Sequence, residues 1–144
     1  MRVILDASVV VAAVATKNPR SAARLVIEAG ALGACVLIVT DEIEAEYRDA
    51  VEREKVKRAT PRGLNRLAFV DAIVGTAERV VPAPGVRVVA KDPKDDKYVA
   101  AAIGGRAGYV VSFDRRHLVA LEMHEGVRFL TPGDFLVVLR AATS

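Results

Sequence analysis

The sequence contains one cysteine, no tryptophan and two histidines among its 144 residues. A lone cysteine, Cys35, excludes an intramolecular disulfide and a cysteine metal cluster, and it fits a reducing cytoplasm. Three tyrosines and four phenylalanines are too few for an extensive base-stacking platform. His117 and His124 lack the spacing of a zinc-binding pair, so we expect them on the surface or packed against a helix.

Long hydrophobic runs are also missing. The longest uncharged apolar stretches, residues 7–15 and 30–40, fall well short of the roughly 20 residues that span a bilayer, so no membrane span is expected. Asp6 interrupts the apolar run that follows Met1 and Arg2, which argues against a secretory signal. With 52% hydrophobic and 27% charged residues, the chain is too apolar to be mainly disordered. Its length fits one domain, residues 1–144.

Charge is unevenly distributed around a formal net value of +3. Residues 48–66 carry seven basic side chains against three acidic ones, a local net charge of +4. Arginines and lysines in such a segment bind phosphate, but a solvated helix face has the same composition, and charge alone leaves both readings open. The basic residues are Arg48, Arg53, Lys55, Lys57, Arg58, Arg62 and Arg66.

The apolar pattern predicts strands alternating with helices. Continuous apolar residues, without alternation, are typical of strands buried on both faces of a parallel sheet. We therefore predict an α/β fold, a three-layer α/β/α sandwich with a central parallel sheet. The expected strands are residues 2–6, 34–39, 108–113 and 127–130, with a short one at 86–89, and the expected helices are 20–31, 41–55, 61–78, 92–104 and 132–139.

Helix ends have recognisable signals. Asp41 and Glu44 fit a capping box that opens the helix over 41–55. Asp92 fits the N-cap of a later helix, with Pro93 at its first position and Asp95 in its first turn. The glycine pair at 104–105 is a good signal for the end of that helix.

Three aspartates are candidates for a metal site. Asp6 and Asp114 follow predicted strands at their carboxyl ends, where α/β sheets bind ligands. Helical phase places Asp95 on the stripe of Tyr98, so we expect Asp95 to face inward and Asp96 to lie nearer the edge. Each aspartate alone has an ordinary alternative as a helix cap or turn residue. Their convergence in one layer favours a site for a hard cation, Mg²⁺ or Mn²⁺, and hence phosphoryl or phosphodiester chemistry.

A fourth acid is expected from the helix over 41–55. Its apolar stripe runs through Ile43 and Tyr47, which places Glu44 and Glu46 on opposite rims. Because Glu44 already serves the capping box, Glu46 is the better candidate.

Three segments together resemble PIN-domain nucleases, and in particular the VapC-like toxins of toxin–antitoxin pairs. They are Val3-Ile4-Leu5-Asp6-Ala7-Ser8, Asp95 to Ala102, and Val110-Val111-Ser112-Phe113-Asp114. The resemblance extends over essentially the whole chain. It implies an α/β/α sandwich whose acidic cluster binds Mg²⁺ or Mn²⁺ and cleaves single-stranded RNA.

By this resemblance, Asp6, Glu46, Asp95 and Asp114 take the places of the four catalytic acids, and Ser112 matches the family's hydroxyl position. Asp6, Asp95 and Asp114 are then the metal ligands. Two positions depart from the usual pattern: Ser8 stands where many members have Asn, and Phe113 replaces what is often a small or basic residue. Neither removes an acid, so both bear on substrate preference.

The resulting expectation is a cytoplasmic, metal-dependent endoribonuclease, with basic residues of segment 48–66 gripping the RNA backbone. The resemblance also implies a cognate antitoxin and a homodimer as partners. Two alternatives stay open: a PIN-like module that binds RNA or protein without cleaving it, and a small-molecule phosphatase. Clustered, mutually repelling carboxylates argue against the silent module. The lack of a second aspartate two residues after Asp6 argues against the phosphatase.

Overall fold

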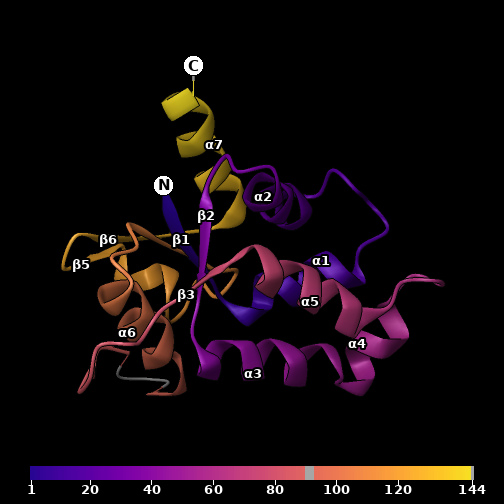
Figure 1. The fold of residues 1–144 in the computed structure, drawn as a ribbon, viewed down its shortest axis with the longest axis horizontal. Coiled ribbons are helices and arrows are strands. Elements are labelled where there is room, and N and C mark those ends of the chain that lie inside the picture. The colour runs from indigo at the N-terminus through magenta and orange to yellow at the C-terminus, as the bar shows by residue number, and fades with distance from the viewer. Residues whose placement is uncertain (90–92, 144) are drawn as a thin grey trace.

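The structure is a computed structural model that describes residues 1–89 and 93–143. Its centre is a six-stranded sheet in the order β3-β2-β1-β4-β6-β5 (Figure 1). All neighbouring strands pair in parallel except β5 with β6, which are antiparallel. The strands are β1 (Arg2–Leu5), β2 (Val36–Val39), β3 (Glu78–Arg79), β4 (Tyr109–Val111), β5 (Met123–His124) and β6 (Val127–Leu130).

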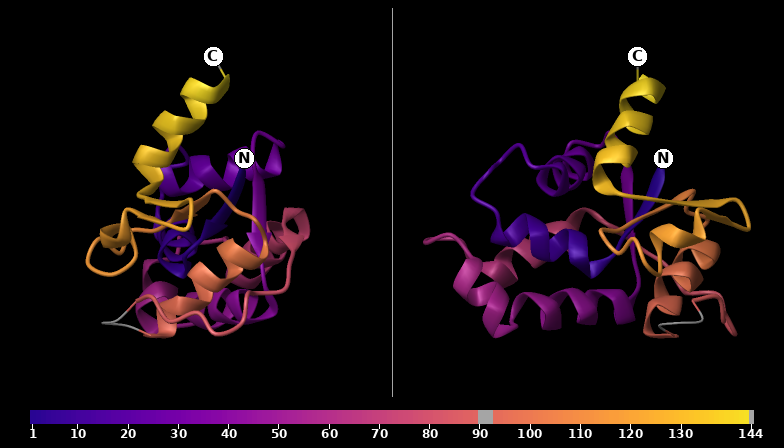
Figure 2. Two further views of the ribbon diagram at one scale, coloured as in Figure 1. Left: turned by 90° about the vertical axis from the view of Figure 1, so that its left-hand side faces the viewer. Right: turned by 180° about the vertical axis from the view of Figure 1, so that it is seen from behind.

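Helices cover both faces of the sheet. Helix α6 packs against β1, β2 and β4 on one face, while α1, α2 and α5 lie on the opposite face, as the views in Figures 1 and 2 agree. Helix α7 packs against α2, and α3 packs against α1 and α5. The helices are α1 (Ala7–Ala15), α2 (Ala22–Ala31), α3 (Asp41–Val51), α4 (Glu54–Ala59), α5 (Arg66–Thr76), α6 (Asp96–Gly104) and α7 (Pro132–Thr143), with 3₁₀ turns at η1 (Pro93–Asp95) and η2 (Val119–Leu121).

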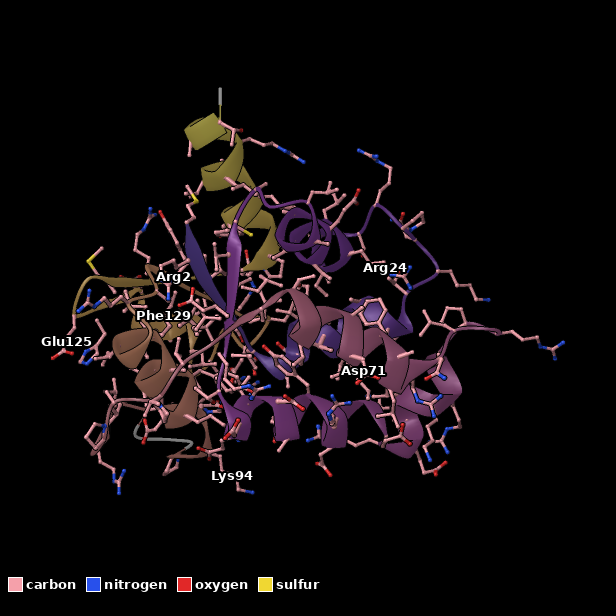
Figure 3. The ribbon with its side chains drawn as sticks, in the orientation of Figure 1. Arg2, Arg24, Asp71, Lys94, Glu125 and Phe129 are labelled. Atoms are coloured by element: carbon pink, nitrogen blue, oxygen red, sulfur yellow. The ribbon has the colours of Figure 1, made fainter. Side chains whose placement is uncertain are left out.

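The central strands form the core. Val3 and Ile4 of β1, with Val110 of β4, are fully buried, and Phe129 of β6, labelled in Figure 3, is nearly so. Burial on both faces explains why these strands carry continuous apolar residues. The predicted α/β fold, with a mostly parallel sheet between helices, is confirmed, with the correction that edge strand β5 is antiparallel.

Arg2, labelled in Figure 3, links β1 to the edge strand β3 and to the end of α6. Its guanidinium donates to both carboxylate oxygens of Glu78 in β3, at 2.6 and 3.2 Å, and to the carbonyl oxygen of Gly105. Helix α6 ends at Gly104, as predicted, with Gly105 as its C-cap. A Cβ at Gly104 would collide with the carbonyl oxygen of Val81, so the loop crossing this helix end requires glycine here.

The register between β1 and β4 places Asp6 and Ser112 next to each other. Leu5 of β1 pairs with Val111 of β4, and the next backbone link runs from the Asp6 N–H to the Val111 carbonyl oxygen at 2.9 Å. Asp6 and Ser112 therefore leave the sheet at the same level, at the carboxyl ends of adjacent parallel strands. Such an edge is where open α/β sheets bind ligands.

Several predicted elements differ in detail. The helix predicted over 41–55 is two helices, because α3 ends at Val51 and α4 begins at Glu54. The helix predicted over 61–78 begins at Arg66, where Asn65 caps it by accepting from the Ala68 N–H. Residues 86–89 form no strand, because amide groups there bond to a carboxylate instead of a neighbouring strand.

The expected helix starts also need correction. Thr40, not Asp41, is the N-cap of α3, and its hydroxyl accepts from the Ile43 N–H at 3.1 Å. Glu44 is not a capping-box acid, because its carboxylate pairs with Arg48 and Arg79. The expected N-cap at Asp92 lies outside the described residues. Within residues 1–89 and 93–143, no helix combines the length and apolar character needed to cross a membrane.

Candidate active site

Four carboxylates line one cleft of about 530 Å³ at the carboxyl ends of β1 and β4. Asp6 follows β1, Glu46 lies on α3, Asp95 precedes α6 and Asp114 follows β4, so four separate segments meet here. All four are acids that the sequence proposed for one site. The remaining lining residues are Ala7, Ser8, Val11, Ala12, Ala50, Arg53 and Phe113.

Asp6 is held by two hydroxyl groups. Its Oδ2 accepts from Ser8 Oγ at 2.8 Å and from Ser112 Oγ at 2.6 Å. Asp6 is only 8% exposed, and it makes no side-chain cap hydrogen bond to α1, although it occupies the N-cap position. The Asp6 carboxylate therefore does not cap α1, and the two serine hydroxyls hold it instead. Its second oxygen, Oδ1, lies outside this hydroxyl network.

Ser112 links two of the acids. This fully buried residue donates its hydroxyl proton to Asp6, and its Oγ accepts from the Asp114 N–H at 2.8 Å. Ser8 makes a parallel link, since its Oγ accepts from the Phe113 N–H at 3.1 Å. Each serine thus ties Asp6 to the segment that carries Asp114. At Ser8, where the family often has Asn, a hydroxyl reaches both partners directly.

Two buried tyrosines fasten the helices that carry the other acids. The Tyr47 hydroxyl on α3 donates to the Leu5 carbonyl oxygen at 2.5 Å, and the Tyr98 hydroxyl on α6 accepts from the Ala7 N–H at 3.2 Å. These two backbone groups flank Asp6. The two hydrogen bonds therefore fix both helices beside Asp6. Tyr47 is the neighbour of Glu46 on α3, and Tyr98 is three residues after Asp95.

Burial and charge keep these tyrosines neutral. Burial raises the pKa of Tyr47, and the negative charge of Asp6 raises it further. The pKa of Tyr98 is raised for the same two reasons, in the same order. Both residues are therefore hydroxyl groups at neutral pH and serve as fixed hydrogen-bonding anchors.

Asp114 is stabilised in its charged form. Burial raises the pKa of this carboxyl, but hydrogen bonds from the backbone and ring of His117 and from the Arg116 N–H outweigh burial and hold the pKa below its usual value. Oδ1 of Asp114 accepts from both backbone N–H groups at 3.1 Å. The turn role expected of an isolated aspartate is therefore present, and the carboxylate still lines the cleft.

Glu46 lies between two cations at the cleft wall. Its Oε1 is 3.6 Å from Arg53 Nη2, and its Oε2 is 3.5 Å from Lys97 Nζ. The Lys97 side chain is largely buried and also lies over the Tyr98 ring. Arg53 and Lys97 thus both contact Glu46, and Arg53 also lines the cleft. By contrast, Glu44 pairs with Arg79 and Arg48, and the hydrogen bond from Arg79 is the main cause of its lowered pKa.

The neighbouring acids Asp95 and Asp96 have different surroundings from those expected. Asp96 is the more buried, at 7% exposed, and its Oδ1 accepts from the Val88 N–H at 2.9 Å and the Val89 N–H at 2.7 Å. Asp95 is half-buried and lines the cleft. The expectation that Asp96 lies nearer the edge is wrong, because η1 inserts a 3₁₀ turn before the helix and changes the phase.

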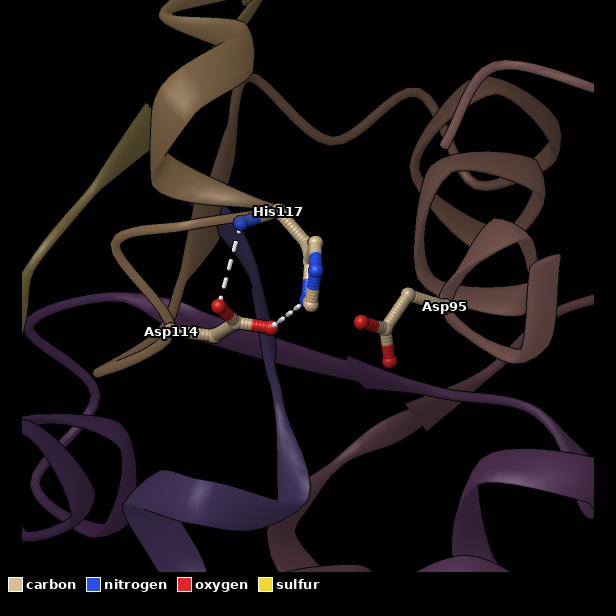
Figure 4. A group of neighbouring side chains, drawn as sticks. All are labelled: Asp95, Asp114 and His117. Atoms are coloured by element: carbon tan, nitrogen blue, oxygen red, sulfur yellow. Dashed lines mark hydrogen bonds and ion pairs between the residues drawn. The ribbon is translucent and has the colours of Figure 1, made fainter. Parts of the chain in front are cut away.

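His117 lies beside the site, although the sequence analysis expects it only on the surface or packed against a helix. Its Nδ1 lies 3.1 Å from Asp114 Oδ2, and one donor atom each from Asp95, Asp114 and His117 lie within 4.8 Å of one another. Figure 4 shows the ring beside the Asp114 carboxylate, with the Asp95 carboxylate facing the same space. His117 follows Asp114 by three residues, and this spacing was the feature of the sequence that could have predicted their contact.

Much of the basic segment 48–66 is engaged in ion pairs. Arg48 pairs with Asp71 at 2.8 Å, Lys57 with Glu52 at 3.4 Å, and Arg53 with Glu46. These side chains therefore help to hold α3, α4 and α5 together. Arg53 is the member of the segment that also lines the cleft.

Comparisons with known proteins agree with this geometry. A model of the PIN domain matches residues 2–116. Among solved structures, the chain is similar to the crystal structure of PAE2754 from Pyrobaculum aerophilum, with 17% sequence identity, a TM-score of 0.59, and coverage of 98% of this chain and 90% of that one. At this identity the likeness shows a shared fold alone. No curated protein matches the chain.

Proposed function

Because the chain belongs to the PIN domain family, whose members are typically nucleases, we propose that it is a metal-dependent endoribonuclease that hydrolyses RNA phosphodiester bonds. The observation that carries this proposal is the meeting of Asp6, Glu46, Asp95 and Asp114 in one cleft. Four carboxylates repel one another unless cations or hydrogen bonds offset their charge. Arg53 and Lys97 offset the charge of Glu46, and a cation held by Asp6, Asp95 and Asp114 would further reduce the repulsion within the cluster.

The donor set fits Mg²⁺ or Mn²⁺. Both ions accept carboxylate oxygens and retain water molecules in their remaining positions. Asp6, Asp95 and Asp114 would hold the ion, with Glu46 completing the cluster as a ligand or through water. A divalent cation bound there supplies an activated water and neutralises charge on the phosphate oxygens.

The chain's own residues prepare this site. Ser8 and Ser112 both donate to Oδ2 of Asp6, so the orientation of this carboxylate is set before substrate arrives. Such preorganised positioning is what catalytic groups require. Arg53 lines the cleft and is exposed, so it can exchange its contact with Glu46 for a phosphate oxygen of an approaching RNA.

The direct test is cleavage of a mixed panel of RNAs and single-stranded DNA with Mn²⁺ or Mg²⁺, repeated after removal of the cation with EDTA. We expect cuts in RNA that depend on the cation. Single-stranded DNA serves as the matched control for the substrate. Failure of the well-folded, metal-saturated protein to cut any RNA, together with RNA binding, would instead support the silent binding module.

We further propose that the enzyme is the toxin of a toxin–antitoxin pair. Besides the resemblance to VapC-like toxins, an apolar groove of about 300 Å³ between α1 and α4 supports this proposal, because it suits a segment of a partner protein. The groove shares Val11 and Arg53 with the acidic cleft, so a segment bound there would lie beside Glu46. The groove is lined by Val11, Ala15, Arg53, Lys55, Val56 and Ala59.

Production of the wild-type chain in a bacterial host is expected to arrest growth, because cleavage of cellular RNA stops protein synthesis. Co-production of a small protein encoded beside its gene is expected to restore growth. The readout is colony formation after induction, with Asp6→Asn as the inactive control. Equal growth with the wild type and the variant, at equal protein levels, would contradict the toxin role.

A further inference from the structure

A nitrogen donor, His117, lies beside two of the carboxylates that line the acidic cleft. Asp95, Asp114 and His117 each offer one ligand atom, and these three atoms lie within 4.8 Å of one another. The two carboxylates come from segments before α6 and after β4, and the imidazole comes from the turn that follows Asp114 (Figure 4). All three side chains are half-buried, so the cluster is open to the cleft.

One measured distance in the cluster fits a shared coordination shell. Neighbouring ligands on an octahedral ion with bonds of about 2.1 Å lie about 3 Å apart, and opposite ligands lie about 4.2 Å apart. His117 Nδ1 lies 3.1 Å from Asp114 Oδ2, so a cation between them would replace this hydrogen bond and bind Nδ1 in its unprotonated form.

The backbone holds His117 in this place. Its N–H donates to Asp114 Oδ1, and the Val119 N–H donates to the Asp114 carbonyl oxygen at 2.9 Å. Leu118, the next residue, is fully buried in the core. The turn is thus anchored on both sides of His117, which presents the ring to the cleft as a fixed group.

We propose that His117 supplies a nitrogen ligand to the cation held by Asp95 and Asp114, and that this ligand shifts the preference of the site from Mg²⁺ toward Mn²⁺. The inference rests on the proposed function, since it concerns the same cation. Mg²⁺ favours oxygen ligands and binds imidazole poorly, whereas first-row transition ions accept nitrogen readily. A wholly carboxylate site would lack this basis for discrimination.

The test uses pulsed electron paramagnetic resonance on the full chain loaded with Mn²⁺. A directly bound imidazole modulates the Mn²⁺ spin echo through its ¹⁴N nucleus. The chain has two histidines, so His124→Asn is a matched control. We expect the ¹⁴N modulation in the wild type and in His124→Asn, and its loss in His117→Asn. Absence of the modulation in the wild type, or its persistence in His117→Asn, would overturn the proposal.

A metal titration separates a ligand from a positioning residue. Asn at 117 keeps an amide that can donate to Asp114 but lacks the imidazole nitrogen. We expect His117→Asn to weaken Mn²⁺ binding by about tenfold or more and Mg²⁺ binding by less than about twofold, because Mg²⁺ makes little use of nitrogen. An equal loss for both ions would assign His117 to positioning Asp114 and contradict the nitrogen ligand.

The two hypotheses fail in different ways. RNA cleavage that needs a cation and Asp6, with Mn²⁺ bound but no ¹⁴N modulation, would overturn the nitrogen ligand and leave the nuclease intact. Mn²⁺ bound with ¹⁴N modulation, without RNA cleavage, would support the ligand and overturn the nuclease.

Discussion

Replacement of Asp6 by Asn is expected to lower cation-dependent RNA cleavage by more than about 100-fold, since loss of even an outer partner of a metal site commonly costs 10- to 100-fold. The substitution removes one negative charge from the centre of the cleft. The amide oxygen of Asn can still accept from Ser8 and Ser112, which now donate to Asp6 Oδ2. The buried hydroxyl network therefore persists, and we expect the fold to be intact.

The measurement is the initial rate of RNA cleavage at saturating Mn²⁺, with thermal unfolding followed by circular dichroism on the same samples. Asp134→Asn is the matched control, because Asp134 is exposed in the first turn of α7 and does not line the cleft. It should cleave at the wild-type rate. Full activity of a folded Asp6→Asn protein would show that the cleft does not perform the chemistry.

Replacement of Asp96 by Ala is expected to lower the free energy of unfolding by about 3 to 6 kcal/mol, since hydrogen bonds to a charged group contribute roughly 1.5 to 3 kcal/mol each and two are lost. The Asp96 carboxylate accepts from the Val88 and Val89 N–H groups, and Val89 is itself buried. Removing the acceptor leaves at least one buried N–H without its partner. Urea denaturation measures the change directly.

The neighbouring acids can then be separated by a conservative pair. Asp96→Asn keeps an oxygen acceptor for both N–H groups, so we expect a smaller loss of stability and substantial RNA cleavage. Asp95→Asn removes a charge from the cleft, so we expect near wild-type stability and little cleavage. An active Asp95→Asn protein beside an inactive, stable Asp96→Asn protein would reverse these assignments.

Much of the fold could be predicted because buried parallel strands leave a strong pattern. The strand over 127–130 was predicted with its observed bounds, and the helix end at 104–105 followed from two glycines. The two-residue strand Glu78–Arg79 was missed because it is exposed and has no apolar pattern. The strand predicted at 86–89 is absent because two of its N–H groups donate to the Asp96 carboxylate instead of to a neighbouring strand. The apolar pattern of 86–89 holds no information about that carboxylate.

Helix boundaries were less predictable for local reasons. The charged stretch around Glu52 and Arg53 has helical propensity throughout. The structure nevertheless ends α3 at Val51 and turns the chain at Arg53, whose extended backbone forms the N-cap of α4. That turn places Arg53 beside Glu46 and at the mouth of the apolar groove. Tertiary packing of α4 against α1 overrides the continuous pattern.

The residues of the candidate site were also predicted only in part. Asp6 and Asp114 were readable as residues that follow buried strands. Glu46 was preferred to Glu44 because Glu44 was assigned to a capping box, whereas in the structure Glu44 pairs with Arg48 and Arg79. The expected position of Asp96 near the edge was wrong because the helical phase was counted through a 3₁₀ turn. His117 was missed because its nearness to Asp95 depends on the turn after β4, which no periodicity describes.

Calorimetric titration of Mn²⁺ into the wild-type protein and into Asp6→Asn tests the central claim most directly, with RNA cleavage followed on the same samples. The account predicts saturable Mn²⁺ binding by the wild type, strongly weakened in Asp6→Asn, with cleavage falling in parallel. Equal Mn²⁺ binding by both proteins, or RNA cleavage that continues without bound cation, would contradict it.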